Sequence, residues 1–249
     1  MSLHLATPAQ YPQLRQLITP ECCGTVYPLS VLGGAQSGAV YTDETGRAAL
    51  IHHCCGFAFL CGEYDAGICR GLAEKLHDPA PFARMILFAP DAQTADFFRS
   101  QAGYAVERRL LYRYPANSAP RKTHASAQIT ADILRKISGK ITPAFSWPED
   151  ADFLERGSGF CVLQDGLPAA WAFSAAVSEN EVDIGVETDE RFRRRGFAFA
   201  AAAAMIADTL SHGKTPVWAC HAGNSGSQKL AEALGFVRCG ECETVRVTA

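Results

Sequence analysis

A cationic segment that ends in glycine carries the clearest chemistry in this sequence. It reads Arg193-Arg194-Arg195-Gly196-Phe197-Ala198, an R-x-x-G-x-A pattern. A tight turn with glycine at its bend leaves backbone N–H groups pointing one way, and a helix that begins there adds the positive end of its dipole. Because Gly196 has no side chain, the backbone can also approach a ligand closely. We therefore predict a phosphate or pyrophosphate site. A solvated charge run or a nuclear-targeting patch is the alternative for the arginines taken alone.

The elements around this turn can be predicted from hydrophobic periodicity and turn residues. They are strands at 159–164, 169–176 and 181–188, a helix at 196–211, a strand at 216–220, a helix at 225–234 and a strand at 237–247. Asp165-Gly166 is typical of a tight hairpin turn, and the alanines at 200–204 predict a helix that packs closely on the sheet. The order predicts an α/β fold with a mixed sheet and helices on its faces. Ligands are then expected at the carboxyl end of the third strand.

A linker and a repeat suggest two domains. The segment Pro115–Lys122 has the composition of a linker, which divides the chain into domains at 1–118 and 119–249. The first half repeats the strand, helix, Gly-aromatic, strand order of the second, and we interpret this as an internal duplication. Chance similarity between two α/β segments is the alternative. Since residues 61–66 of the first copy contain no basic residue, one anion site per chain is expected.

Composition limits the classes of partner. The 249 residues are 48% hydrophobic and 20% charged, with a net charge of -3, so the chain has no broad basic field for nucleic acid or an anionic membrane. The longest uncharged apolar run, Phe197–Ala207, is too short to span a bilayer. The first residues lack the plan of a signal peptide. We expect a cytoplasmic protein with no nucleic-acid or membrane partner.

The ten cysteines predict free thiols and no metal site. The C-x-x-C pair Cys239 and Cys242 has no second pair to complete a zinc site. The segment His52–Cys55 is the alternative source of further ligands. Buried or surface thiols in a reducing compartment fit the sequence better, because a free thiol behaves as a small hydrophobic group.

Three segments of the second half resemble the GNAT acetyltransferase superfamily. They are Gly185–Thr188, the arginine turn, and Asn224–Phe236, which reads N-x-x-S-x-x-L-A-x-x-L-G-F. The resemblance covers about residues 123–249 and implies a GNAT-like acyl-CoA N-acyltransferase fold. The layout in two halves also resembles a bacterial subfamily with a degenerate first half, which implies two tandem GNAT-like halves.

The resemblance implies acetyl-CoA as cosubstrate and places it on this chain. The turn formed by residues 193–198 would hold the pyrophosphate. The backbone of the third strand at Val186, Glu187 and Thr188 would align the pantetheine amides and the thioester carbonyl. The helix that carries Asn224 and Ser227 would lie beside the pantetheine arm. Helix capping is the alternative role for these two residues, and the two roles are compatible.

Acetyl transfer to an amine requires a group that accepts a proton. Glu181, Asp183 and Glu187 fall on one face of the third strand, and we assign the general base to Glu181 or Asp183. Solvent-facing strand residues are the alternative. Many superfamily members have a tyrosine, which acts as general acid, at the position of Ala231. His221 and Cys220 are the candidate replacements, although a histidine at a strand end is usually a surface residue, and water can also protonate a thiolate.

Aromatic residues and surface from the first half are the candidate walls of the acceptor site, the aromatic residues being Phe145, Trp147, Phe153, Phe160 and Trp171. Phe145 and Trp147 lie in a proline-flanked loop, so they could face a ligand, whereas most other aromatics should be core. The sequence predicts an acetyl-CoA-dependent N-acetyltransferase that acts on a primary amine of a small molecule or peptide. A non-catalytic acyl-CoA-binding or sensing protein is the alternative, and a transferase using aminoacyl-tRNA is disfavoured by the net charge. A homodimer is left open.

Overall fold

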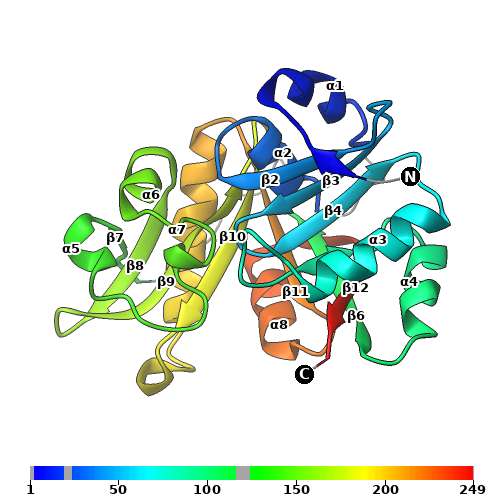
Figure 1. The fold of residues 1–249 in the computed structure, drawn as a ribbon. Helices are drawn as coiled ribbons and strands as arrows, with labels where there is room; N and C mark the ends of the chain where they lie inside the picture. Colours follow the sequence, from blue (N-terminus) through cyan, green and yellow to red (C-terminus); the bar gives the residue numbers. More distant parts are fainter. Residues whose placement is uncertain (1–2, 20–23, 116–123, 249) are drawn as a thin grey trace. The chain divides into compact units, whose positions relative to one another are not determined.

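The computed structural model describes residues 3–19, 24–115 and 124–248 (Figure 1). It divides into two compact units. Unit 1 consists of Met1–Leu111 and Gly240–Ala249, and unit 2 of Tyr112–Cys239. The predicted linker and the boundary between residues 118 and 119 lie outside the described residues, apart from Pro115.

Unit 1 is built on a mixed sheet. Its elements are β1 His4–Leu5, η1 Pro8–Gln10, α1 Tyr11–Arg15, α2 Val26–Leu32, β2 Gly38–Thr42, β3 Ala48–His53, β4 Phe57–Gly62, α3 Ala66–His77, β5 Ile86–Phe88, α4 Ala92–Arg99 and most of β6 Tyr104–Arg113. The order of strands is β1-β2-β3-β4-β5-β12-β6, and β12 (Val237–Val247) enters it through its residues after Cys239. β4 and β5 are parallel, whereas β12 runs antiparallel to β5.

Helices cover both faces of this sheet. α3 and α4 contribute Ile68, Leu72 and Phe98 to a core that also contains Leu50 and Leu60. α2 packs against β3 and β4 on the other face. There the Tyr27 ring meets the Phe57 ring edge-on, with the centroids 5.1 Å apart. The alternation of side chains along β3 and β4 therefore buries both faces.

Unit 2 has the same order of strands and α-helices, although its 3-10 turns fall at other places. Its elements are β7 Ala127–Gln128, α5 Ala131–Leu134, η2 Pro143–Phe145, α6 Asp150–Arg156, β8 Gly159–Gln164, β9 Leu167–Val177, β10 Glu181–Thr188, η3 Glu190–Phe192, α7 Phe197–Ser211, β11 Thr215–His221, α8 Ser225–Leu234 and the start of β12. The strand order is β11-β10-β9-β8-β7. The mixed α/β fold is confirmed, and β8 and β10 begin and end at the predicted residues. Asp165 and Gly166 both have positive φ, as a tight hairpin turn requires.

Small side chains let α7 lie close to the sheet, as predicted. Ala200, Ala201, Ala202 and Ala203 are buried, and α7 packs against β8, β9 and β10 (Figure 1). On the opposite face, side chains of β9 pack under α5, η2 and α6. The buried aromatic residues of this second core are Trp147, Phe153, Trp171 and Phe173.

The prediction that Trp147 faces a ligand is wrong. Its side chain is 2% exposed, and its indole N–H donates to the Ser174 carbonyl at 2.7 Å. The cause is the 3-10 turn η2, where the N–H groups of Ser146 and Trp147 both donate to the Pro143 carbonyl. This tight turn directs the chain back towards the sheet, so the indole enters the core.

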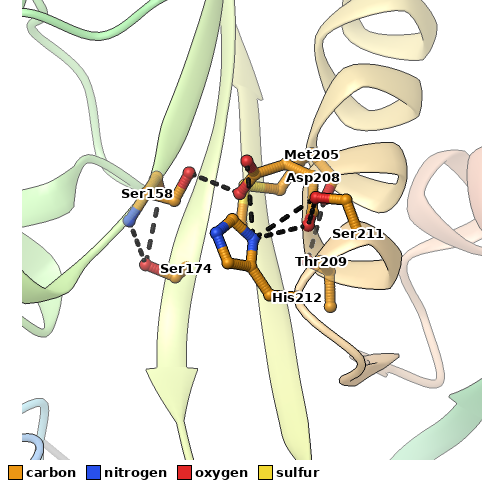
Figure 2. Close-up of polar contacts among 7 residues, drawn as sticks. All are labelled: Ser158, Ser174, Met205, Asp208, Thr209, Ser211 and His212. Atoms are coloured by element: carbon orange, nitrogen blue, oxygen red, sulfur yellow. Dashed lines mark hydrogen bonds and ion pairs between the residues drawn. The ribbon is translucent and has the colours of Figure 1, made fainter.

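A polar network fastens the far end of α7. Figure 2 shows Ser158 between Ser174 of β9 and Asp208 of α7. The Ser158 hydroxyl donates to Asp208 Oδ2 at 2.8 Å, and the Ser158 N–H donates to the Ser174 hydroxyl at 2.9 Å. His212 Nδ1 lies 2.8 Å from the Asp208 carbonyl at the end of the helix. These contacts fix the carboxyl end of α7, and thereby the direction in which its amino end points.

Candidate functional site

β10 and β11 diverge in the middle of unit 2. These parallel strands pair only over Glu181–Asp183 and Thr215–Val217. Their carboxyl halves, Ile184–Thr188 and Trp218–His221, are not paired with each other, and both segments are fully described. On its other side β10 stays paired with β9 as far as Thr188, with a register shift between Asp183 and Ile184. The divergence opens an edge of β10 whose backbone groups can receive a ligand.

The arginine turn follows this edge. Arg194 has φ 63° and Gly196 has φ 79°, so two residues of the turn are left-handed. The first is uncommon for a residue with a side chain and stores strain of about 1 kcal/mol. Gly196 is the N-cap of α7. Backbone N–H groups near such a bend converge to form a concave anion site.

The amino end of α7 is open. Among the described helices of eight or more residues, α3, α4 and α8 are each capped by a side chain, whereas α7 has no side-chain cap and no acidic residue in its first turn. The first N–H groups of a helix have no partner within it. At α7 they remain available for an anion, since no side chain of the described residues caps them.

Arg191 is committed to the structure of the turn. Its guanidinium donates to both carboxylate oxygens of Asp189, at 3.0 and 2.7 Å. The hydrogen bonds from Arg191 hold the pKa of Asp189 down to about 2. Asp189 also accepts the Arg191 backbone N–H at 3.0 Å and so caps η3. Arg191 therefore stabilises η3, the segment that leads into the turn.

The three following arginines differ in their partners. Arg193 pairs with Glu190 at 3.0 Å. Arg194 and Arg195 are exposed and form no ion pair among the described residues. The Arg195 guanidinium lies 5.6 Å from the centroid of the Phe192 ring. Arg194 and Arg195 are thus the cations best placed to meet an added anion.

His124 is a neighbour of the turn that the sequence did not reveal. A Cβ atom at Gly196 would lie 3.5 Å from His124 Nε2. The imidazole also meets the Phe197 ring edge-on, with the centroids 5.1 Å apart. His124 precedes the first strand of unit 2 by only a few residues and belongs to no motif, so nothing local indicated this contact.

Asn224 and Ser227 both have structural partners at the start of α8. Asn224 Oδ1 accepts the Ser227 N–H at 3.0 Å and is the N-cap of the helix. The Ser227 hydroxyl accepts the indole N–H of Trp218 at 2.9 Å. The capping role is therefore present, and a ligand contact would be additional to it.

The carboxylates of β10 lie at different points along the strand. Glu181, at the amino end, pairs with Arg113. Asp183 is 6% exposed and lies where the pairing of β10 with β11 ends. Glu187, near the carboxyl end, accepts the Ile141 N–H at 2.6 Å through Oε2. At ~3.3 Å per residue, Glu181 lies roughly 23 Å from Thr188, which sets it far from the arginine turn.

The candidates for a general acid are sparse. Ala231 is fully buried. His221 is exposed, and its Nδ1 accepts the Gly223 N–H at 2.9 Å, which leaves the proton of the neutral ring on Nε2. Tyr112, which belongs to unit 2, is 2% exposed. Burial and the nearby Cys220 and Glu232 raise its pKa.

The matching position of unit 1 is closed to anions. There the helix after the third long strand is α3, and Oδ1 of Asp65 accepts the N–H groups of Gly67 and Ile68, both at 2.9 Å. A cavity of about 270 Å³ lies between the ends of β4 and β5, lined in part by Phe59 and Phe88. This end of the unit 1 sheet therefore has a cavity but no open helix end.

The described residues contain no group of three or more histidine, cysteine or acidic side chains that could hold a metal ion. Cys239 is exposed and Cys242 is buried, and neither belongs to a disulfide. None of the described helices is long and apolar enough to cross a membrane.

Comparison with known proteins gives consistent matches. Residues 25–244 match the family model of GNAT acetyltransferases. The chain is 31% identical over 246 residues to the uncharacterized N-acetyltransferase YdfB of Bacillus subtilis (strain 168), over 92% of this chain and 93% of that protein.

Solved structures share the fold at lower identity. A GCN5-related N-acetyltransferase-like protein from Streptococcus suis superposes with a TM-score of 0.77 at 20% identity, over 98% of this chain and 100% of that one. A tandem GNAT protein from the clavulanic acid biosynthesis pathway has a TM-score of 0.60 at 13% identity, over 99% and 98% of the two chains. Both matches extend over nearly the whole chain, and so over both units.

Proposed function

Because this chain belongs to the GNAT acetyltransferase family and is an N-acetyltransferase, we propose that it transfers the acetyl group of acetyl-CoA to a primary amine of a small molecule or peptide. The open amino end of α7, beside the unpaired edge of β10, is the observation that carries this proposal. It offers an anion site and an extended polar edge in one continuous segment, which matches a ligand with a pyrophosphate and a long amide-containing arm.

The pyrophosphate would meet the turn formed by residues 193–198. The N–H groups at the start of α7 would donate to the phosphate oxygens, and Arg194 and Arg195 would supply charge. Gly196 supports this role, because it has no side chain to cover the helix end and it adopts the left-handed φ of 79° that the turn requires. The amides of the arm would then pair with the backbone of Val186, Glu187 and Thr188, where β10 has no partner on the side of β11.

Asp183 is the residue we favour as general base. It is buried at the point where β10 and β11 separate, at the inner end of the opening. Glu181 is less suited, because it lies at the amino end of the strand and pairs with Arg113. Acetyl-CoA supplies an activated thioester, and Asp183 would take the proton that the attacking ammonium group must lose. His221 stays a candidate donor to the leaving thiolate through Nε2.

We infer one acetyl-CoA site per chain. Both units have the order β-β-β-α-β-α-β, which supports an origin by tandem duplication. Only unit 2 has the uncapped helix after its third strand, since Asp65 occupies the corresponding helix end in unit 1. The carboxylate would repel a pyrophosphate there.

A non-catalytic acyl-CoA-binding protein is the competing function, because the fully buried Ala231 supplies no acid. The two functions differ in whether the protein transfers the acetyl group of acetyl-CoA to an amine. Purified protein would be titrated calorimetrically with CoA and acetyl-CoA, and then incubated with acetyl-CoA and a panel of amines. Products should be followed by mass spectrometry, since the exposed thiol of Cys239 would react with thiol reagents. Acetylated amine supports the enzyme, tight binding without turnover supports the sensor, and no CoA binding contradicts both.

A further inference from the structure

One backbone unit of the segment between α5 and η2 is held from both sides. The Ile141 N–H donates to Glu187 Oε2 at 2.6 Å, and the Ile141 carbonyl accepts the indole N–H of Trp171 at 2.8 Å. Glu187 and Trp171 lie directly opposite each other on β10 and β9. A cross-strand pair of side chains thus fixes a segment that lies 46 residues before Glu187.

Gly139 is part of the same arrangement. A Cβ atom at this position would lie 2.4 Å from Oε2 and 2.8 Å from Cδ of Glu187. Real Cβ contacts are not this short, so the carboxylate reaches Ile141 only because residue 139 has no side chain. The sequence therefore combines a glycine, a glutamate and a tryptophan to hold the segment on the sheet.

The position of this contact gives it functional weight. Glu187 is the penultimate residue of β10, in the half where β10 and β11 are separate. Its side chain falls on the same face as Asp183, because the two are four residues apart on β10 and the register shift between Asp183 and Ile184 leaves its extra residue, Ala175, on β9. An amine that approaches Asp183 along this face passes the segment that Glu187 holds.

We infer that Glu187 is a positioning residue that latches residues 139–141 to the carboxyl end of β10, where the segment forms a wall of the amine-acceptor site. This inference rests on the proposed acetyl transfer. It gives the side chain of Glu187 a role distinct from that of its backbone, which we have placed beside the pantetheine arm. The latch acts through a hydrogen bond to an oxygen atom, and neither proton transfer nor negative charge is needed.

Two substitutions of Glu187 distinguish, in steady-state kinetics, a hydrogen-bonding role of its side chain from a role in proton transfer or charge attraction. E187A removes the acceptor atom, and the KM for the amine should rise about tenfold while kcat and the KM for acetyl-CoA change less than about twofold. E187Q keeps an oxygen that can accept the Ile141 N–H, so its amine KM should stay within about threefold of wild type. E149Q, at an exposed glutamate before α6, is the control and should match wild type.

The alternatives predict different results for E187Q. If Glu187 were the general base, E187Q would abolish kcat, because an amide cannot take the proton. If its charge attracted the ammonium group, E187Q would raise the amine KM as much as E187A does. Either result would overturn the latch.

A double-mutant cycle tests the contact with Gly139. G139A places a methyl group against the carboxylate, so it should raise the amine KM about as much as E187A does. In the E187A background the methyl group has room, and G139A should add less than about twofold. Full additivity of the two effects would contradict the steric coupling.

Hydrogen exchange provides a readout that does not depend on catalysis. The Ile141 amide should be protected in the wild-type protein, and its exchange should accelerate about tenfold or more in E187A but far less in E187Q. Unchanged exchange in E187A would overturn the latch, and faster exchange with an unchanged amine KM would overturn the acceptor wall. If the wild type acetylated no amine, the proposed function would fail and with it the acceptor wall, while exchange would still decide the latch.

Discussion

Asp65 and Gly196 occupy the same position in the two units, the N-cap of the helix that follows the third strand of a β-β-β segment. The Asp65 carboxylate covers two N–H groups of α3, and Gly196 covers none of α7. A single residue type therefore separates a helix end that is closed to anions from one that is open.

Transferring the aspartate to unit 2 should close the open site. In G196D a carboxylate would lie at the amino end of α7 and repel the pyrophosphate, and we expect the affinity for CoA to fall about 100-fold or more. The side chain has room among the described residues, whose nearest atom to a Cβ at this position is 3.5 Å away. Aspartate also tolerates a left-handed φ better than most residues. Isothermal titration with CoA is the measurement.

G196N is the matched control for that substitution. Asparagine has nearly the same shape and also tolerates the left-handed conformation, but it carries no charge. We expect it to lower the affinity about tenfold, because a side chain without charge would only obstruct the approach of the ligand to the helix end. Circular dichroism should give the same folded signal for both variants. CoA affinity in G196D equal to that of the wild type would contradict the pyrophosphate assignment.

The arginines in and before the turn should not contribute equally to the affinity for CoA. R195Q removes a cation that has no ion-pair partner among the described residues, so CoA affinity should fall about tenfold. R191Q should change it less than about threefold, because Arg191 already pairs with Asp189. Titrations at low and high salt provide a second test. The affinity of R195Q should depend less on salt than that of the wild type, and equal effects of the two substitutions would refute the distinction.

Local patterns predicted the elements of unit 2 and the turn well. Alternation along 181–188 and the Asp165-Gly166 turn are short-range signals, and glycine at position 196 indicated the open bend. The same patterns could not predict the partner of the end of β12, which belongs to unit 1 and pairs with β5 at Thr244 and Val245. Strand pairing over such a distance in sequence depends on which hydrophobic edges meet, and no local signal specifies it.

The details of the site depended on long-range contacts. The pairing of Glu187 with Ile141 and the proximity of His124 to Gly196 both join segments far apart in the sequence. Asp65 could have been found, since an aspartate before a helical pattern is a typical cap. The absence of basic residues at 61–66 is the weaker signal, because the Asp65 carboxylate itself is the stronger obstacle to an anion.

Close packing at Gly185 should make a small substitution destabilising. A Cβ atom there would lie 2.7 Å from Cζ of Phe173, which is fully buried. G185A should lower the free energy of unfolding of unit 2 by about 1–3 kcal/mol, because the ring cannot move without disturbing the core. Urea denaturation followed by tryptophan fluorescence reports on this unit, since Trp147, Trp171 and Trp218 all belong to it.

G226A provides the comparison in the same unit. Gly226 lies in the first turn of α8, and the nearest atom to a Cβ there is 3.7 Å away, an ordinary contact. Alanine should stabilise the helix by roughly 0.5–1 kcal/mol. If G185A were also stabilising, the ring of Phe173 would have to be less confined than the structure indicates.

Unit 1 should lose stability in mild acid because of a buried histidine. Burial, followed by the charge of His52, lowers the pKa of His53 from 6.5 to about 3. The unfolded chain therefore binds a proton at His53 as the pH falls below about 6.5, whereas the folded protein stays neutral at this site. The contribution of His53 to the free energy of unfolding is thus complete above about pH 6.5 and is lost progressively towards pH 3. For this group the free energy of unfolding should fall by about 2 kcal/mol between pH 7 and pH 5.

H53N keeps an oxygen that can accept the Cys55 N–H but cannot titrate, so its stability should change less over that interval. Chemical denaturation followed by circular dichroism is the measurement. Between pH 7.5 and pH 9 the wild type and H53N should show the same pH dependence, and equal slopes between pH 7 and pH 5 would contradict the prediction.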